Sequence, residues 1–276
     1  MFPYRTTQSE RSSLEPVLPI SYTAGPIIRH KGQPLARPRV IIPVFPGTNC
    51  EFDTLAAFER AGALVTTQII MLPGGFSGGD EPDGSAKFIT AFFRAPEVTE
   101  AVRRLLQQRD GLILGICNGF QALVMLGLVP FGDIVEPSED NATLTFNSIG
   151  RHQSRMVNTR VASNLSPWLS KCHVGDIHTI AISHGEGRFV APQPLIDQMI
   201  ERGQVATQYV DESGIPSMDL AVNPNGSILA IEGITSPDGR IFGKMGHSER
   251  EGSGLYKNVR GNLHQPIITG GVSYFL

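Results

Sequence analysis

Along residues 39–127, segments with the hydrophobic pattern of buried strands alternate with segments whose apolar residues have helical spacing. Short β-branched runs, typical of buried strands, are separated by segments whose apolar residues recur at helical spacing. The predicted strands are RVIIPVF (39–45), LVTTQIIML (64–72) and GLILGI (111–116). The predicted helices are FDTLAAFERAG (52–62), AKFITAFF (86–93), EVTEAVRRLLQQ (97–108) and NGFQALVMLG (118–127). Strands that alternate with helices predict a doubly wound, mostly parallel α/β sheet with helices on its faces.

The second half of the chain is richer in strand patterns than the first. The predicted strands are RMVNTRVA (155–162), DIHTIAIS (176–183), GRFVA (187–191), VATQYV (205–210) and SILAIEGI (227–234). One helix is expected at PLIDQMIERG (194–203), and a hairpin around Ser236-Pro237-Asp238-Gly239. We therefore expect a single domain over residues 39–276.

Residues 1–38 form a separate region that contains six prolines, several serines and no clear period. This composition predicts an extended leader or linker. Two interpretations remain open: an arm that folds onto its own domain, and a connector to something upstream. The segment has no basic flank followed by an apolar run, so it is not a signal peptide.

Composition excludes several classes of protein. The net charge of −3 gives no sign of a nucleic-acid-binding or polybasic membrane surface. No segment is long and apolar enough to cross a bilayer. The three cysteines are too few, and odd in number, for a disulfide framework. We therefore expect a cytoplasmic protein without nucleic-acid or membrane partners.

One cysteine, Cys117, lies at a predicted strand-to-helix junction between Gly115 and Gly119. Reactive groups of parallel sheets lie at the carboxyl ends of strands, and a tight turn there presents one side chain to the cleft. The two glycines would remove the clashes of such a turn. The N-terminus of the following helix favours the thiolate, which is the attacking species. A buried structural cysteine is the alternative, but this context favours a nucleophile.

A nucleophilic cysteine needs a base and a group that orients the base. Two histidines have a glutamate two positions later, namely His184 with Glu186 and His247 with Glu249. Residues at this spacing point to the same side of an extended segment, so either carboxylate could hold its imidazole. Spacing alone does not choose between the two pairs.

The glycine-rich segment LPGGFSGGD (72–80) ends a predicted strand. Its backbone N–H groups could approach a ligand closely. It lacks the Lys-Ser or Lys-Thr ending of a phosphate loop, so the sequence gives no ATP site.

Five segments together resemble the class I glutamine amidotransferases, whose fold is flavodoxin-like. More narrowly, they resemble the glutaminase part of phosphoribosylformylglycinamidine synthases. They are PVFPGTNCE, LPGGFSGGDE, GICNGFQAL, SHGEGRF and GKMGHSER, in the family's order. Two departures are Ser248, where the family has proline between histidine and glutamate, and the GGFSGGDEPDGS loop. The loop resembles a branch in which the glutaminase is the C-terminal part of one long synthase, while a free-standing subunit remains the alternative.

The resemblance assigns roles that spacing leaves open. It implies that Cys117 is the nucleophile, that His247 is the general acid and base, and that Glu249 orients His247. The other implied site residues are Gly75, Phe76 and Asn118 at the oxyanion hole, and Gln121, His184 and Glu186 in the glutamine pocket.

The implied activity is hydrolysis of L-glutamine through a cysteinyl thioester. Ammonia would pass to a synthetase domain or subunit that makes formylglycinamidine ribonucleotide in purine biosynthesis. ATP and magnesium are expected on that partner, and no metal or cofactor on this chain. Two alternatives remain: a γ-glutamyl peptidase or amidase of the same fold without ammonia channelling, and a non-catalytic binding module.

Overall fold

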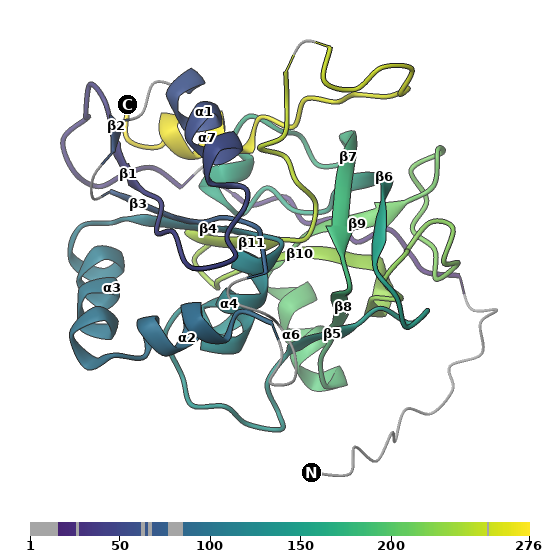
Figure 1. Cartoon of the computed structure of the whole chain (residues 1–276), viewed down its shortest axis with the longest axis horizontal. Coiled ribbons are helices and arrows are strands. Elements are labelled where there is room, and N and C mark those ends of the chain that lie inside the picture. Colours follow the sequence, from purple (N-terminus) through teal and green to yellow (C-terminus); the bar gives the residue numbers. More distant parts are fainter. Residues whose placement is uncertain (1–15, 26–27, 62–63, 66–67, 77–84, 253) are drawn as a thin grey trace.

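The computed structural model describes residues 16–25, 28–61, 64–65, 68–76, 85–252 and 254–276. The first 15 residues of the predicted leader and residues 77–84 of the glycine-rich loop lie outside the described residues. A central sheet is covered by helices on both faces (Figure 1). Helices α1 (Glu51–Arg60) and α7 (Ile267–Ser273) lie together on one face. The opposite face carries α2 (Lys87–Phe93), α3 (Pro96–Gln108), α4 (Asn118–Leu126) and α6 (Gln193–Glu201).

The sheet has nine strands in the order β2-β1-β3-β4-β11-β10-β9-β6-β7. Its first five strands pair in parallel and the rest are antiparallel. The parallel strands are β1 (Arg39–Ile41), β2 (Leu64–Val65), β3 (Ile69–Leu72), β4 (Leu112–Ile116) and β11 (Ile241–Lys244). The antiparallel strands are β6 (Gln153–Val161), β7 (Ile177–His184), β9 (Val205–Val210) and β10 (Ile231–Thr235). The predicted α/β class, with a mostly parallel sheet flanked by helices, is confirmed. The antiparallel part lies in the strand-rich second half, where β10 and β11 form the predicted hairpin.

Three local features differ from the sequence prediction. The predicted strand 64–72 is divided into β2 and β3, which pair with β1 on opposite sides. A small second sheet pairs β5 (Thr143–Phe146) with β8 (Glu186–Val190). The sequence prediction did not include β5, a four-residue strand in which polar and apolar residues alternate. Helix α7 contains two adjacent glycines, which are poor helix formers. Both are close to Trp168, so packing rather than propensity determines this helix.

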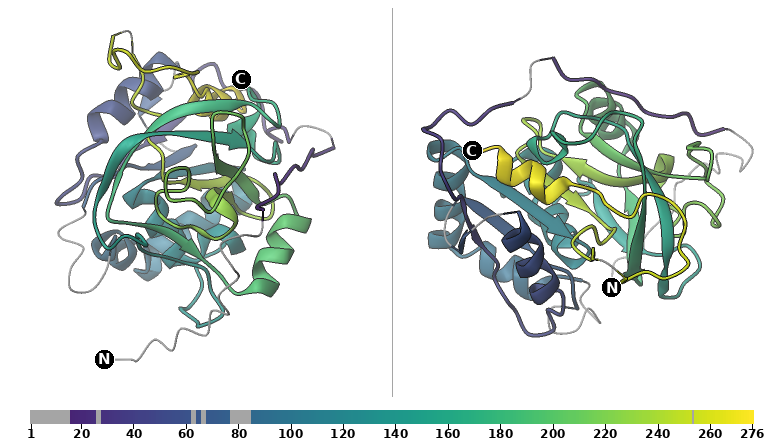
Figure 2. Two further views of the ribbon diagram at one scale, coloured as in Figure 1. Left: turned by 90° about the vertical axis from the view of Figure 1, so that its right-hand side faces the viewer. Right: turned by 90° about the horizontal axis from the view of Figure 1, so that it is seen from above.

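Residues 16–25 and 28–38 lie on the surface of the same domain (Figure 2). Tyr22 pairs with the backbone beyond β6, donating its N–H to Ala162 O at 2.8 Å. Leu35 N–H donates to Phe275 O at 2.7 Å, near the C-terminus. The described part of the leader is therefore an arm folded onto its domain. No helix among the described residues is long and apolar enough to cross a membrane.

Asp110 connects the N-terminal arm to the rest of the domain through hydrogen bonds. Its carboxylate accepts from Lys31 N at 2.8 Å, Tyr274 Oη at 2.8 Å and Arg240 Nη1 at 3.2 Å. His30 Nδ1 lies 3.3 Å away. Burial alone would raise the pKa of Asp110, but these donors hold it below its ordinary value. The carboxylate thus connects the arm, the C-terminal helix and the β10–β11 hairpin.

We predict that Asp110→Asn lowers the free energy of unfolding by about 2 kcal/mol at pH 7, because charge-assisted hydrogen bonds are lost. The lowered pKa means that the charged carboxylate stabilises the fold above its unfolded-state pKa, and that this contribution disappears as the pH falls below about 4. Urea unfolding at several pH values measures both effects. The control is Asp133→Asn, whose solvent-screened pair with Arg103 should change the free energy of unfolding far less. Equal effects of the two substitutions would contradict the assignment.

Candidate active site

Cys117 lies between β4 and α4 in a backbone conformation that L-residues rarely adopt, with φ 54° and ψ −109°. Its N–H donates to Lys244 O at 2.9 Å, and its C=O accepts from Gln121 N at 3.0 Å. A non-glycine residue in such a conformation costs about 1–3 kcal/mol and persists only when its surroundings enforce it. This is the geometry of a nucleophile elbow, in which the turn aims one side chain at the cleft.

The glycines on either side of the elbow are required by close packing, as the sequence predicts. A Cβ on Gly119 would lie 2.0 Å from Leu72 O, a backbone atom of the neighbouring strand. A Cβ on Gly115 would lie 2.7 Å from Gly119 C and O. The start of α4 therefore sits directly on the end of β3, and this contact fixes the position of Cys117.

His247 and Glu249 lie in the turn that follows β11, the strand beside β4. In the parallel register Lys244 pairs with Ile116, so both strands end at the same edge of the sheet. His247 Nδ1 lies 2.6 Å from Glu249 Oε1, and both side chains are buried. Burial alone would lower the pKa of His247, but the Glu249 carboxylate and the Cys117 thiol raise it well above its ordinary value. Burial would likewise raise the pKa of Glu249, which His247 instead lowers.

Gly74 lies where the turn that carries His247 meets the turn that carries Cys117. A Cβ placed there would lie 2.8 Å from His247 Cε1, 3.1 Å from Cys50 Sγ and 3.4 Å from Cys117 Cβ. Nε2 of His247 is buried and has no hydrogen-bond partner among the described residues, while Nδ1 is held by Glu249. The imidazole therefore keeps a free nitrogen beside the thiol.

The second candidate pair, His184 and Glu186, is arranged differently. His184 is buried, and neither ring nitrogen has a hydrogen-bond partner among the described residues. Burial, together with the nearby His247, lowers the pKa of His184 to about 3. Glu186 instead accepts from Ser85, through both Oγ and the backbone N–H. Of the two His–Glu pairs, only His247–Glu249 has the hydrogen bond that orients a base.

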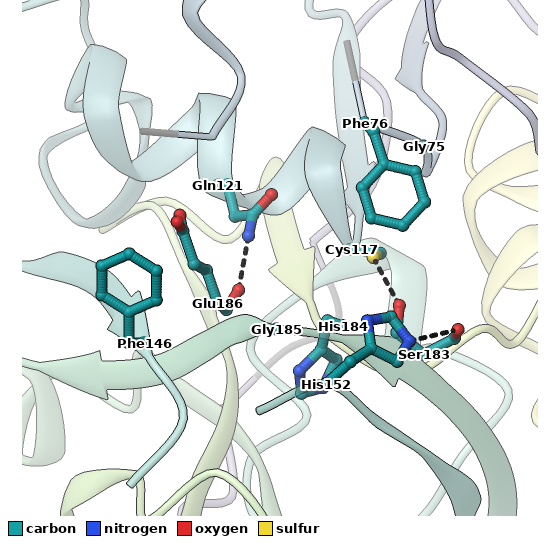
Figure 3. A pocket seen from close by; sticks show the side chains of 10 residues that line it. All are labelled: Gly75, Phe76, Cys117, Gln121, Phe146, His152, Ser183, His184, Gly185 and Glu186. Atoms are coloured by element: carbon teal, nitrogen blue, oxygen red, sulfur yellow. Dashed lines mark hydrogen bonds between the residues drawn. The ribbon is translucent and has the colours of Figure 1, made fainter. Parts of the chain in front are cut away.

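The Cys117 side chain faces a pocket of about 490 Å³ (Figure 3). Six predicted site residues line it: Gly75, Phe76, Cys117, Gln121, His184 and Glu186. Asn118 lies behind the wall, where its Nδ2 donates to Gln121 Oε1 at 2.9 Å. Gln121 Nε2 in turn donates to Glu186 O. His247 and Glu249 are absent from the lining and lie behind Cys117.

The sequence reasoning missed four residues that line the pocket: Phe146, His152, Ser183 and Gly185. Ser183 O is 3.7 Å from Cys117 Sγ, and Phe146 is on the unpredicted strand β5. The SHGEGRF segment, which contains Ser183 and Gly185, was the available signal for those two. Phe146 ends the alternating segment TLTF, but that pattern predicts only a strand and not a position in the pocket, and no local pattern marks His152.

Backbone amides on two sides of Cys117 are candidates for an oxyanion hole. Gly75 has φ 146°, and a Cβ there would lie 2.5 Å from Gly47 O, so only glycine fits. The Phe76 N–H already donates to Gly47 O at 2.9 Å. Among the three predicted oxyanion residues, Gly75 and Asn118 are therefore better candidates than Phe76 to donate backbone N–H groups.

The other two cysteines have different surroundings. Cys50 has its Sγ 4.0 Å from His247 Nδ1 and 3.0 Å from Arg250 Nη2. Donor atoms of Cys50, His247 and Glu249 lie within 4.8 Å of one another, a spacing that could suit a metal ion. The Arg250 guanidinium beside the sulfur would repel a cation there. Cys172 is buried, and burial raises the pKa of its thiol to about 12, as expected for a structural cysteine.

Comparison with known proteins identifies the family of this chain. The family model of the CobB/CobQ-like glutamine amidotransferase domain matches residues 37–269. The chain belongs to this family.

Similar proteins include subunits of one synthase. The phosphoribosylformylglycinamidine synthase subunit PurQ of Aquifex aeolicus is 34% identical over 221 residues, covering 75% of this chain and 88% of the relative. The PurQ subunit of a Synechococcus strain is 36% identical over 228 residues, covering 78% and 89%. Among solved structures, a chain of PurLQS from Thermotoga maritima aligns with a TM-score of 0.64 at 27% identity, over 86% of this chain and 99% of that one.

We predict that Glu249→Gln lowers the pKa of His247 from its raised value, because burial then acts without the carboxylate that opposes it most strongly. An NMR titration of the His247 imidazole measures the change. The control is Glu251→Gln, which removes a carboxylate that pairs with His264 rather than with His247. A His247 pKa unchanged by Glu249→Gln would show that Glu249 does not set the charge of the imidazole.

Proposed function

We propose that this chain is the glutaminase component of a phosphoribosylformylglycinamidine synthase. The observation that carries the proposal is the strained Cys117 turn at the pocket floor, with the His247–Glu249 pair directly behind it. Its family and its PurQ relatives support the same assignment. The partner is an ATP- and magnesium-dependent synthetase, which receives ammonia and makes formylglycinamidine ribonucleotide. The unpaired cysteines and this ATP-using partner lead us to expect a cytoplasmic location.

The reaction has two steps at Cys117. The thiolate attacks the side-chain carboxamide of glutamine, and backbone N–H groups of Gly75 and Asn118 stabilise the tetrahedral oxyanion. Imidazolium at His247 donates a proton to the leaving nitrogen, which departs as ammonia and leaves a γ-glutamyl thioester. Neutral His247 then takes a proton from water, whose oxygen attacks the thioester. Collapse of this second tetrahedral intermediate expels the Cys117 thiolate beside the His247 imidazolium, and the acid formed loses its proton to solvent as glutamate. Glu249 holds the imidazole throughout.

The pocket offers groups that suit the amino-acid end of glutamine. Among the described residues that line the pocket, Glu186 contributes the one carboxylate, and its Oε2 accepts from Ser85. A fixed carboxylate is a partner for the α-ammonium group. Gln121, tied to both Asn118 and Glu186 O, shapes the wall between this carboxylate and Cys117.

We predict that Cys117→Ala lowers glutamine-dependent activity by at least about 10⁴-fold, since no thioester can form. Assayed with the synthetase, the variant should keep its activity with ammonium salts, because only the ammonia source is lost. Cys172→Ala, a buried cysteine outside the pocket, serves as the control. Retained glutamine hydrolysis in Cys117→Ala would remove Cys117 from the mechanism. Turnover of γ-glutamyl peptides by the wild type without a synthetase would favour the peptidase alternative.

We predict that Glu186→Gln raises the KM for glutamine by about 10- to 100-fold while kcat changes little, because a charge-assisted hydrogen bond to the α-ammonium is lost. Steady-state glutaminase assays measure both constants. The comparison is Glu201→Gln, which neutralises a carboxylate at the end of α6, outside the pocket. An unchanged KM in Glu186→Gln would place the α-ammonium elsewhere.

A further inference from the structure

A fully buried ion pair lies beneath the turn that carries His247 and Glu249. Lys244 Nζ and Glu232 Oε1 are 3.6 Å apart, and neither side chain is exposed. Burial lowers the pKa of Lys244, and the Glu232 and Glu249 carboxylates partly oppose that effect. Desolvating two charges is expensive, and a buried pair often stabilises a fold no more than apolar residues would. Stability alone therefore does not explain why the Lys244–Glu232 ion pair is buried at this place.

Lys244 contacts the triad turn through the residue between His247 and Glu249. Its Nζ donates to Ser248 Oγ at 2.7 Å and to Gln265 Oε1 at 2.7 Å. Ser248 Oγ donates to the same Gln265 oxygen at 2.6 Å. These three bonds form a closed triangle that ties the turn to β11 and to the segment preceding α7.

Glu232 holds the residue on the other side of His247. Its Oε1 accepts from Gly246 N at 2.7 Å, and its Oε2 accepts from Thr207 Oγ1 at 2.5 Å. A Cβ on Gly246 would lie 2.9 Å from Glu232 Oε1, so the backbone approaches the carboxylate as closely as glycine allows. The residues before and after His247 are thus each held by one member of the ion pair.

We propose that Lys244, Glu232 and Gln265 are positioning residues that hold His247 and Glu249 against Cys117 through Gly246 and Ser248. Serine occupies the position at which the family resemblance expects proline, so hydrogen bonds here take over the restraint that a proline ring would give. The proposal rests on the proposed glutaminase function for its kinetic consequences, while the geometry of the triad is independent of that function.

The titratable groups around the network come from several elements. His247 faces Glu249 from its own turn, Cys117 from the β4–α4 elbow, Cys50 beside α1, and His184 from β7. Lys244 faces Glu232 from β10 and Glu249, with His178 and Cys172 nearby. A change in how the turn is held therefore alters the distance from His247 to the carboxylate and thiol that raise its pKa.

The test removes the ion pair as a unit. Lys244→Met with Glu232→Gln avoids leaving one uncompensated buried charge and keeps an oxygen for Gly246 N. We expect kcat for glutamine to fall by about 10- to 100-fold, as small misplacements of catalytic groups cause, with KM little changed. The His247 pKa, measured by NMR without substrate, should move from its raised value toward the ordinary one. Adding Ser248→Pro should recover most of the lost kcat, because a proline restrains the same turn.

A milder variant and a control complete the design. Ser248→Ala keeps both charges and removes one hydroxyl, and should lower kcat by about fivefold, the effect of one lost hydrogen bond. Gln204→Leu removes buried hydrogen bonds to Pro130 O and Thr235 O, and should lower Tm without changing kcat or the His247 pKa. Wild-type kcat and His247 pKa in the double variant, or in Ser248→Ala if the double variant does not fold, would overturn the proposal. If the wild type has no glutaminase activity, the proposed function is refuted but the positioning proposal is not. The His247 pKa, measured by NMR, still tests whether the network positions His247.

Discussion

The strained backbone at Cys117 is the constraint on which the site depends. Its left-handed conformation is maintained by a hydrogen bond to Lys244 O and by the contact of Gly119 with the end of β3. These neighbours belong to the two strands on either side of β4. The sheet thus provides the restraint that keeps an unfavourable turn in place.

The same strand order also brings the proposed catalytic groups together. Strands β4 and β11 are parallel neighbours, so Cys117 and His247 follow strand ends at one edge of the sheet. Beyond β11 the sheet becomes antiparallel, and β7 reaches back to supply Ser183 and His184 to the pocket. The site lies where the parallel and antiparallel parts of the sheet meet. The buried polar network of Lys244, Glu232 and Gln265 lies next to the turn that carries His247 and Glu249.

The sequence predicted the parts that depend on local patterns. Helices α1 to α4, helix α6 and the β1, β3 and β4 strands follow from hydrophobic period, and Cys117 follows from its glycines and its junction. The choice of His247 over His184 required the family resemblance, because both have a glutamate at the same spacing. The structure distinguishes them through a single hydrogen bond. Phe146, His152 and the Lys244–Glu232 pair could not be predicted, since each depends on contacts between segments far apart in the chain.

The central claim is that Cys117 is a glutamine-specific nucleophile. Treatment with an electrophilic glutamine analogue, with and without the synthetase, followed by mass spectrometry of the peptides, tests it most directly. We predict an adduct on Cys117 that excess glutamine prevents and that Cys117→Ala abolishes. An adduct on Cys50 or Cys172 instead, or no adduct under either condition, would contradict the claim and favour a binding module that keeps the fold without the chemistry.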